Sequence, residues 1–361
     1  VGQPGCAEVV AQGPSKSSIV LDSGLAVDLR CVRAEQFPFA LAHFTGSREH
    51  NAALRGLARK RGWRLNEYGL FAGEELLACE NEAQIYERLG LDCVPPELRE
   101  DRGEIEAAQQ GVLPALLEES QLRGVFHVHT TASDGTGTLE EMVAEARGHG
   151  WSYLGICDHS RSAHYANGLD SAAVRRQWTE IDALNAAVEN FRVFKGIESD
   201  ILADGSLDYE EDVLGGFDFV IASVHSRFGL SRREQTERLI RAIENPHTTM
   251  IGHLTGRLLL ARDGYDVDQE AVIEAAARHG VILELNANPH RLDLDWRQLK
   301  SAREAGVLIA INPDAHSPAG LGHTRYGVGI ARKGWLEATD VLNTRPADEV
   351  AELLQRRKAR P

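Results

Sequence analysis

The chain has 361 residues, of which 43% are hydrophobic and 26% are charged, so it is long enough to form two domains with a sizeable core. Its net charge of −15 excludes a protein that holds nucleic acid by overall electrostatic attraction, because such proteins are normally basic. No run of about 18 apolar residues is present to span a bilayer, and the five cysteines, without a C-x-x-C pair, favour free thiols. We therefore expect a cytoplasmic protein without a membrane partner.

The first third of the chain has the pattern of an α+β segment. Residues 7–13, 17–22 and 24–32 are predicted to form three antiparallel strands, because turn residues separate their apolar runs. Helices are expected at 36–43, 49–61 and 82–88. We assign residues 1–94 to this first domain and residues 95–122, which begin with two prolines and are rich in acidic residues, to a linker.

The remainder, residues 123–361, alternates short apolar runs with amphipathic stretches that are typical of helices, such as 139–150 and 269–280. Strands are predicted at 124–130, 153–159, 191–198, 218–225, 248–253, 280–287 and 307–316. Because these runs are apolar on both faces, they favour a parallel sheet covered by helices. Seven β-α units indicate an α/β fold, a distorted (β/α)7 TIM-like barrel, although a doubly wound sheet fits the alternation nearly as well.

Acidic and imidazole side chains stand at the carboxyl ends of the predicted strands, where the loops of a β-α barrel converge and ligands bind. The first strand ends in the H-x-H pair His127 and His129, a spacing that places both imidazoles on one face of the strand. The other candidates are Asp134, His159, Glu198, His225, His253, Asp314 and His316.

A single histidine at such a place would usually be a hydrogen-bonded core or loop residue. The whole set without metal would bring many desolvated imidazoles and carboxylates to one rim, so we predict a metal site. The mixture of His, Asp and Glu without thiolate suits Mn, Zn or Fe. Nine ligands suit two or three ions, and clustered divalent ions can hold a phosphate and activate water.

These residues occur in motifs that resemble the PHP domain (polymerase and histidinol phosphatase). The motifs are HVHTTASDG, DHS, GIESDI, SVHS, GHLTGRLL, ELNANPHRLDL and DAHS. The resemblance implies a seven-stranded barrel with three divalent metal ions. It assigns the ligands of one ion as His127, His129, Glu198 and Asp314, those of the second as Glu198, His225 and His253, and those of the third as Asp134, His159 and His316.

The front of the chain resembles the palm and thumb of bacterial family X DNA polymerases, which carry a C-terminal PHP domain. The segments that carry this resemblance are GLAVDLRCV, HFTGSREHNAALRGLARKRGW and LNEYGL. It implies that Asp28 is the third polymerase carboxylate, which would bind Mg or Mn in a full-length parent. It also implies nucleotide or DNA contacts by Phe44, Gly46, Ser47, Asn51 and Arg55. Such a palm carries two further carboxylates on an earlier strand, and the printed sequence does not contain them. We therefore expect a truncated polymerase that does not extend primers.

Together the two resemblances imply a metal-dependent phosphoesterase that acts on DNA 3′ ends, in gapped or single-stranded DNA. The expected activity is a Mn-stimulated 3′–5′ exonuclease of a repair polymerase, with 3′-phosphatase or abasic-site (AP) endonuclease activity as related reactions. Arg161, Arg257 and Arg291, in predicted rim loops, are candidates for binding the phosphate. Asp158 and Asp200 are candidates for orienting the ligands.

Three alternatives remain open from the sequence. One is a small-molecule phosphatase of the histidinol-phosphate type, and another is a non-catalytic module in which metals brace the fold and support the polymerase. The third is an amidohydrolase barrel, which also opens with H-x-H and usually adds a bridging strand lysine; Lys195 lies on the strand of Glu198 but on its opposite face. The sequence leaves the metal identity and the oligomeric state undecided.

Overall fold

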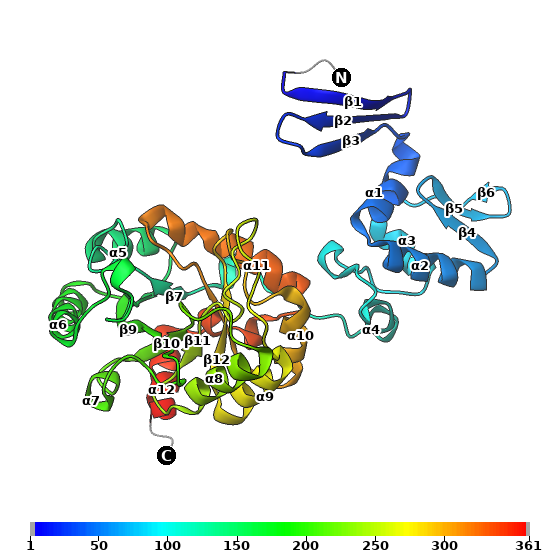
Figure 1. Ribbon diagram of the computed structural model, residues 1–361. Coiled ribbons are helices and arrows are strands. Elements are labelled where there is room, and N and C mark those ends of the chain that lie inside the picture. Colours follow the sequence, from blue (N-terminus) through cyan, green and yellow to red (C-terminus); the bar gives the residue numbers. More distant parts are fainter. Residues whose placement is uncertain (1–3, 359–361) are drawn as a thin grey trace. The chain divides into compact units, whose positions relative to one another are not determined.

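The computed structural model describes residues 4–358 and divides into two compact units, Val1–Leu113 and Pro114–Pro361 (Figure 1). The stretch 95–122, predicted to be a linker, contains helix α4 (Glu104–Gln110). Ile105, Ala107 and Ala108 of this helix are buried, so the amino-terminal part of the stretch is packed into the first unit. No helix in the described residues is both long and apolar enough to cross a bilayer.

The first unit begins with the three antiparallel strands that the turn pattern predicts, in the order β1-β2-β3. Their bounds are β1 (Cys6–Gln12), β2 (Lys16–Leu21) and β3 (Ala26–Arg30). The three predicted helices are confirmed as α1 (Phe37–Thr45), α2 (Arg48–Lys60) and α3 (Glu82–Arg88). A second antiparallel sheet was not predicted; it consists of β4 (Trp63–Asn66), β5 (Gly69–Ala72) and β6 (Glu75–Leu76).

A buried polar network joins α2 to α4 in the first unit. His50 and Glu104 are both fully buried, and the His50 Nδ1 atom lies 2.6 Å from Glu104 Oε1. The other ring nitrogen of His50 lies 2.9 Å from the hydroxyl of Tyr86, which belongs to α3. Glu104 also accepts hydrogen bonds from the backbone N–H groups of Asp101 and Arg102. Three helices are therefore connected through groups that would be unsatisfied if any one partner were lost.

The second unit contains seven parallel strands in the sequential order β7 to β13. Their bounds are β7 (Gly124–Val128), β8 (Tyr153–Ile156), β9 (Arg192–Asp200), β10 (Phe219–Ser223), β11 (Met250–Ile251), β12 (Ile282–Asn286) and β13 (Ile309–Asn312). The backbone N–H of His129 donates to the carbonyl of Ala315, and that of Ala315 donates to the carbonyl of His127. Because these bonds connect the ends of β7 and β13, the sheet is a nearly closed barrel and the doubly wound alternative is wrong.

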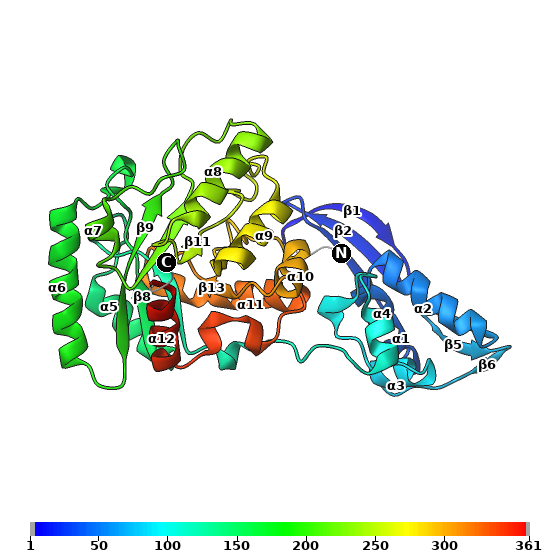
Figure 2. The same cartoon turned by 90° about the horizontal axis from the view of Figure 1, so that it is seen from below.

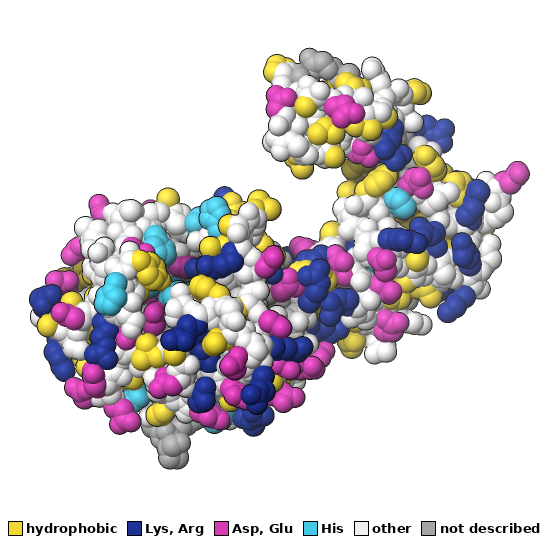
Figure 3. Space-filling view, in the orientation of Figure 1, with side chains coloured by type: hydrophobic (Ala, Val, Ile, Leu, Met, Phe, Trp, Pro, Cys, Tyr) yellow, Lys and Arg dark blue, Asp and Glu magenta, His cyan; other side chains and the backbone are white. Residues whose placement is uncertain are grey.

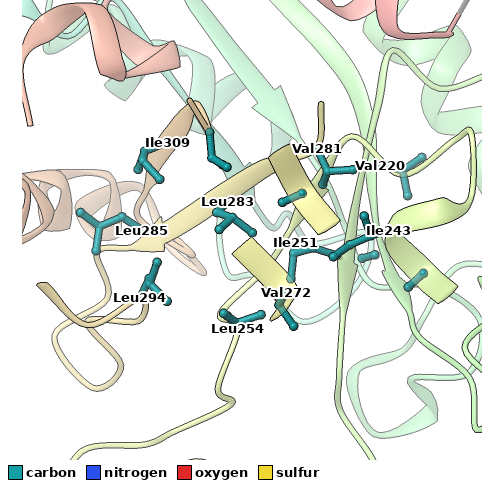
Figure 4. Packing of buried hydrophobic residues seen from close by; sticks show 14 of the residues in the cluster. Val220, Ile243, Ile251, Leu254, Val272, Val281, Leu283, Leu285, Leu294 and Ile309 are labelled. Atoms are coloured by element: carbon teal, nitrogen blue, oxygen red, sulfur yellow. The ribbon is translucent and has the colours of Figure 1, made fainter. Parts of the chain in front are cut away.

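Helices follow the strands around the outside of this barrel (Figure 2). They are α5 (Leu139–Gly148), α6 (Ser171–Ala187), α7 (Glu211–Leu214), α8 (Arg232–Glu244), α9 (Gln269–His279), α10 (Trp296–Glu304), α11 (Thr324–Lys333) and α12 (Ala347–Lys358). In Figure 4, Ile251 and Leu283 of neighbouring strands lie against Val272 of α9. This apolar contact between sheet and helices is what the two-sided hydrophobic strands require.

Aromatic side chains fill the inside of the barrel. The ring of Phe126 packs edge-on against Phe219, with the centroids 4.9 Å apart. Two glycines leave room for these rings: a Cβ atom on Gly155 would lie 2.2 Å from Phe126 Cδ1, and one on Gly196 would lie 2.1 Å from Phe219 Cζ. The amino-terminal half of the barrel is therefore a solid core, and its carboxyl end is left for polar side chains.

Candidate metal centre

The barrel brings all nine predicted ligands together at the carboxyl ends of its strands. Their donor atoms form four overlapping groups, within each of which the atoms lie within 4.8 Å of one another. These groups are His129–Asp134–His159–His316, His127–His129–Asp314, His127–Glu198–His253 and His159–Glu198–His225. Histidine side chains also reach the surface on the upper part of this unit in Figure 3.

Glu198 lies at the middle of the cluster and is almost completely buried. Its Oε1 atom lies 3.2 Å from His127 Nε2, 3.2 Å from His225 Nε2 and 2.9 Å from His253 Nε2. Its Oε2 atom lies 2.9 Å from His159 Nδ1 and 3.7 Å from His129 Nε2. A single carboxylate is thus within reach of five imidazoles, and at this position it could be shared between cations.

The other acidic ligands complete the two sides of the cluster. Asp314 Oδ1 lies 3.5 Å from His129 Nε2 and 3.6 Å from His127 Nε2. Asp134 Oδ2 lies 3.4 Å from His316 Nε2 and 3.6 Å from His159 Nε2. Asp314 therefore faces two imidazoles from the end of β7, whereas Asp134 faces two imidazoles that follow different strands.

The ring nitrogens of His129 indicate whether the cluster could hold cations. Both of its ring nitrogens are buried and have no hydrogen-bond partner among the described residues, and the same is true of His127 Nε2. Leaving such atoms unsatisfied is costly. The separations of 3.5–3.8 Å between His129 and its acidic neighbours are too long for hydrogen bonds. They are close to the separation of roughly 3–3.5 Å between two ligands that bind one ion at about 2.0–2.2 Å, so the residues fit divalent cations.

The titration behaviour of the cluster points the same way. Burial lowers the pKa of His225, but the carboxylates of Glu198 and Asp200 outweigh this effect and raise it to about 10. Burial also acts against the proton on His316, yet Asp134 and Asp314 raise its pKa to about 9. At His225 and His316 the negative field is thus strong enough to hold protons on the imidazoles at neutral pH, whereas burial lowers the pKa of His129 to about 4 and also lowers that of His253. A cation that binds beside His225 or His316 would take the place of these protons.

Glu284, to which the sequence analysis assigns no role, is a further part of the site. This buried residue of β12 places its Oε1 atom 2.6 Å from His127 Nδ1, and its Oε2 atom accepts a hydrogen bond from the backbone N–H of His253 at 2.7 Å. The sequence could have revealed Glu284 because it is a carboxylate within an otherwise apolar strand, and a buried carboxylate needs a partner.

Asp200 and Asp158 take different places around the cluster. Asp200 Oδ1 lies 2.6 Å from His225 Nδ1, which is the contact of a residue that orients a ligand. Asp158 instead accepts hydrogen bonds from Thr130, Ser133 and Gln177. It therefore holds the loop that carries Asp134 rather than a histidine ring.

The three candidate arginines have unequal surroundings. Arg291 Nε donates to Asp314 Oδ2 at 3.1 Å, so its guanidinium is in contact with the ligand cluster. Arg257 is engaged with Asp295 and with backbone carbonyl groups of the loop 291–292, which it braces. Arg161 is paired with Asp208 and Glu210. Of the three, the structure brings only Arg291 into direct contact with a predicted ligand.

The residues predicted from the polymerase resemblance lie in the first unit. Asp28 is exposed on β3, where its carboxylate is 3.0 Å from Lys16 Nζ. Ser47 is the N-cap of α2, and Asn51 donates from its amide to the carbonyl of His43 and, across the same turn, to that of Gly46. Phe44 is exposed on α1, and Arg55 lies on α2. Ser47 and Asn51 thus also have local structural roles in the turn between the two helices.

The nearly closed barrel and its nine His, Asp and Glu side chains are the features of a PHP domain. The family description "PHP domain" matches residues 126–288, and "DNA polymerase beta thumb" matches residues 40–100. The chain is 33% identical over 199 residues to a probable phosphatase of Caldicellulosiruptor saccharolyticus. This alignment covers 53% of this chain and 78% of that protein. A crystal structure of histidinol phosphate phosphatase from Lactococcus lactis is 19% identical, covers 58% of this chain and 93% of that one, and superposes with a TM-score of 0.44.

The most extensive of these similarities is to the DNA polymerase/3′-5′ exonuclease PolX of Bacillus subtilis (strain 168), which is 43% identical over 357 residues. The alignment covers 98% of this chain and 62% of the Bacillus protein. The chain therefore spans less than two thirds of that relative, and it carries a PHP domain preceded by a polymerase beta thumb segment, as the motifs that resemble PHP-containing family X DNA polymerases indicate.

Proposed function

We propose that this chain is a metal-dependent phosphoesterase that removes nucleotides from DNA 3′ ends, as a Mn-stimulated 3′–5′ exonuclease. The observation that carries the proposal is the clustering of nine buried or half-buried candidate ligands, five of whose imidazoles surround the carboxylate of Glu198. Family membership supports a phosphate ester as the substrate, and the thumb match at residues 40–100 supports DNA. The related 3′-phosphatase and AP-endonuclease reactions would use the same centre.

The ligands divide into three sets in this proposal, each of which would hold one cation. The first set is His127, His129, Glu198 and Asp314; the second is Glu198, His225 and His253; the third is Asp134, His159 and His316. Cations bound there would neutralise the phosphate and lower the pKa of water, which removes the need for a serine or cysteine nucleophile.

The side chains around these sets have separate tasks. Glu284 and Asp200 orient the rings of His127 and His225 through bonds of 2.6 Å. Arg291 fixes Asp314 and brings a positive charge to the rim of the centre, where it would steady the phosphate. On α2, Arg55, Arg59 and Lys60 would contact the DNA backbone.

The test is hydrolysis of a 3′-labelled single strand and of histidinol phosphate, each with Mn²⁺ and then with a chelator. We expect stepwise release of nucleotides from the strand, loss of activity with chelator, and a much lower rate on histidinol phosphate. 3′-Phosphate and abasic substrates are run in parallel. Preferential hydrolysis of histidinol phosphate would favour a small-molecule phosphatase, and metal binding without any hydrolysis would favour a bracing role.

Variants identify the source of the activity. His127→Ala and Glu198→Gln should each abolish nucleotide release, because each removes a ligand. His149→Ala is the matched control, because this exposed histidine stacks on Trp151 outside the cluster. Nuclease activity that is unchanged in His127→Ala and Glu198→Gln would show that it comes from a contaminant.

A further inference from the structure

An exposed aromatic ring stands beside the metal centre. The Tyr165 side chain is 71% exposed, and its ring centroid lies 6.0 Å from that of His159 and 6.4 Å from that of His225. Among the residues that the structure describes, Tyr165 is the one phenylalanine, tyrosine or tryptophan whose ring lies against a ligand histidine. A large apolar face is therefore open at the place where a substrate must approach the cations.

The backbone that carries Tyr165 is held firmly. Ala163 precedes the short 3-10 helix His164–Ala166, and Ala166 is its last residue. Both alanines are fully buried. The N–H groups of Ala166 and Gly168 both donate to the carbonyl of Ala163. Gly168 lies so close to the chain that a Cβ atom there would be 1.8 Å from the carbonyl oxygen of Ser160. The exposed ring is thus presented by a fixed turn, and a flat ligand could stack on it without ordering a loop.

With cations bound to the ligand cluster, the surroundings of Tyr165 would complement a phosphate ester rather than a plain apolar ligand. Its ring lies next to two histidines of the cation cluster, and Arg291, bound to Asp314, supplies a guanidinium at the same centre. The guanidinium of Arg161, in the same loop as Tyr165, is already paired with Asp208 and Glu210. A ligand that places its phosphate at the cations would meet an aromatic face beside it. A nucleotide fits this arrangement, because it joins a phosphate to a flat base.

We propose that Tyr165 is a stacking platform for the base of the 3′-terminal nucleotide of a single DNA strand. The proposal rests on the proposed function, because the terminal phosphodiester would lie at the metal centre. Stacking on an aromatic ring tolerates all four bases, since every base has a π face. It predicts an enzyme that depends on the presence of a base but not on its identity, and that gains about 5- to 100-fold in affinity from this contact.

The experiment compares strands that end in an ordinary 3′ nucleotide with strands whose last nucleotide lacks its base. Affinity is measured by fluorescence anisotropy in Mn²⁺ on strands with a phosphorothioate at the last linkage, which slows hydrolysis, and kcat/KM is measured on unmodified strands. The wild-type chain should prefer the base-bearing end by about 5- to 100-fold. Tyr165→Phe, which keeps the ring, should retain the preference, and Tyr165→Ala should bind both ends equally.

Two controls separate stacking from damage to the site. The metal content of Tyr165→Ala should equal that of the wild-type chain, which would show that the ligand cluster is intact. Tyr68→Ala, which removes an exposed tyrosine of the first unit, should keep the preference for the base. An equal affinity of the wild-type chain for both ends, or an undiminished preference in Tyr165→Ala, would overturn the inference. If the wild-type chain hydrolyses neither strand, the proposed function fails, and the anisotropy measurement still decides whether the base is bound.

Discussion

Glu284 connects two ligands of the metal centre through one buried carboxylate. Its Oε1 atom faces Nδ1 of His127 and also accepts a hydrogen bond from the side-chain amide of Asn312 at 3.0 Å. Its Oε2 atom accepts a hydrogen bond from the backbone N–H of His253. This arrangement directs Nδ1 of His127 toward Glu284 and leaves Nε2 facing the cluster, where it could bind a cation. The residue would therefore act on a metal centre without being a ligand.

Replacing Glu284 by glutamine should weaken metal binding by about 10- to 100-fold, because an amide retains the shape but loses the charge that orients His127. Calorimetric titration of the metal-free chain with Mn²⁺ measures this change. Glu270→Gln, an exposed change on α9, is the matched control and should leave the affinity unaltered. An unchanged affinity in Glu284→Gln would mean that His127 is oriented by its packing alone.

The clustering of the nine candidate ligands could be predicted from the sequence because each stands at or just beyond the end of an apolar run. The partners of these ligands could not be predicted in the same way. The contact of Glu284 with His127 joins residues of β12 and β7, and it depends on the rotation of an imidazole ring that no sequence pattern encodes. Tyr165 gave no signal at all, because a single tyrosine in a loop is ordinary.

The contact between β9 and β10 requires a residue without a side chain at Gly196. Gly196 pairs with Phe219 in the parallel ladder, and Phe126 packs on that phenylalanine from inside the barrel. Gly196→Ala should lower the free energy of unfolding by about 1–3 kcal/mol, because the added carbon overpacks the aromatic layer. Thermal unfolding measures the loss.

Gly148→Ala in α5 is the control for this substitution. Nothing lies within 4 Å of the added carbon at that position, and alanine favours the helix. It should be neutral or stabilise the protein by up to about 1 kcal/mol. A Gly196→Ala protein as stable as the control would show that the Phe219 ring moves aside at little cost.

The bond between α2 and α4 makes the first unit sensitive to acid. Burial acts to raise the pKa of Glu104, but the hydrogen bonds from His50 and from the backbone N–H groups of Asp101 and Arg102 keep it below its ordinary value of 4.5. Because the pKa is lower in the folded than in the unfolded chain, this stabilisation is present above about pH 4.5 and is lost as the pH falls through the folded value.

Glu104→Gln should therefore destabilise the first unit at pH 7 by about 1–3 kcal/mol and make its stability less dependent on pH in the acid range. Hydrogen exchange of α2 and α4 in the full chain, measured in increasing denaturant, reports this unit separately. Glu106→Gln, an exposed change in the same helix, should preserve the acid sensitivity of the wild-type chain. Equal acid sensitivity in Glu104→Gln would assign the effect to other groups.

The sequence predicted most elements within a few residues, since apolar periodicity and glycine or proline breaks are local signals. It did not reveal α4, whose apolar Ile105, Ala107 and Ala108 are outweighed by the acidic residues around them. The strands β4, β5 and β6 were also missed, because runs of two to four residues are too short for a periodic pattern.

The fold of the second unit as a whole rests on a contact between its first and last strands. The alternation of strands and helices could not distinguish a barrel from an open sheet, because both have the same local pattern. The hydrogen bonds between Ala315 and the backbone of His127 and His129 make the difference, and they join residues far apart in the sequence.

Metal removal should act on the second unit alone, because all nine ligands belong to it. A cation at 100 times its dissociation constant stabilises the folded state by about 2.7 kcal/mol per site, so a chelator should speed hydrogen exchange in β7, β9 and β13. Exchange in α2 of the first unit should stay constant and provides the internal control. Unchanged exchange in β9 would mean that cations do not bind to the folded barrel.

Because the barrel closes between its first and last strands, the candidate metal centre can form only late in the synthesis of the chain. β7 supplies His127 and leads into His129, whereas Asp314 and His316 follow β13. A nascent chain on the ribosome that has not yet released β13 lacks two of the nine ligands and the strand that faces the first. The set of nine candidate ligands is therefore complete only after β13 and the residues that follow it have paired with the end of β7.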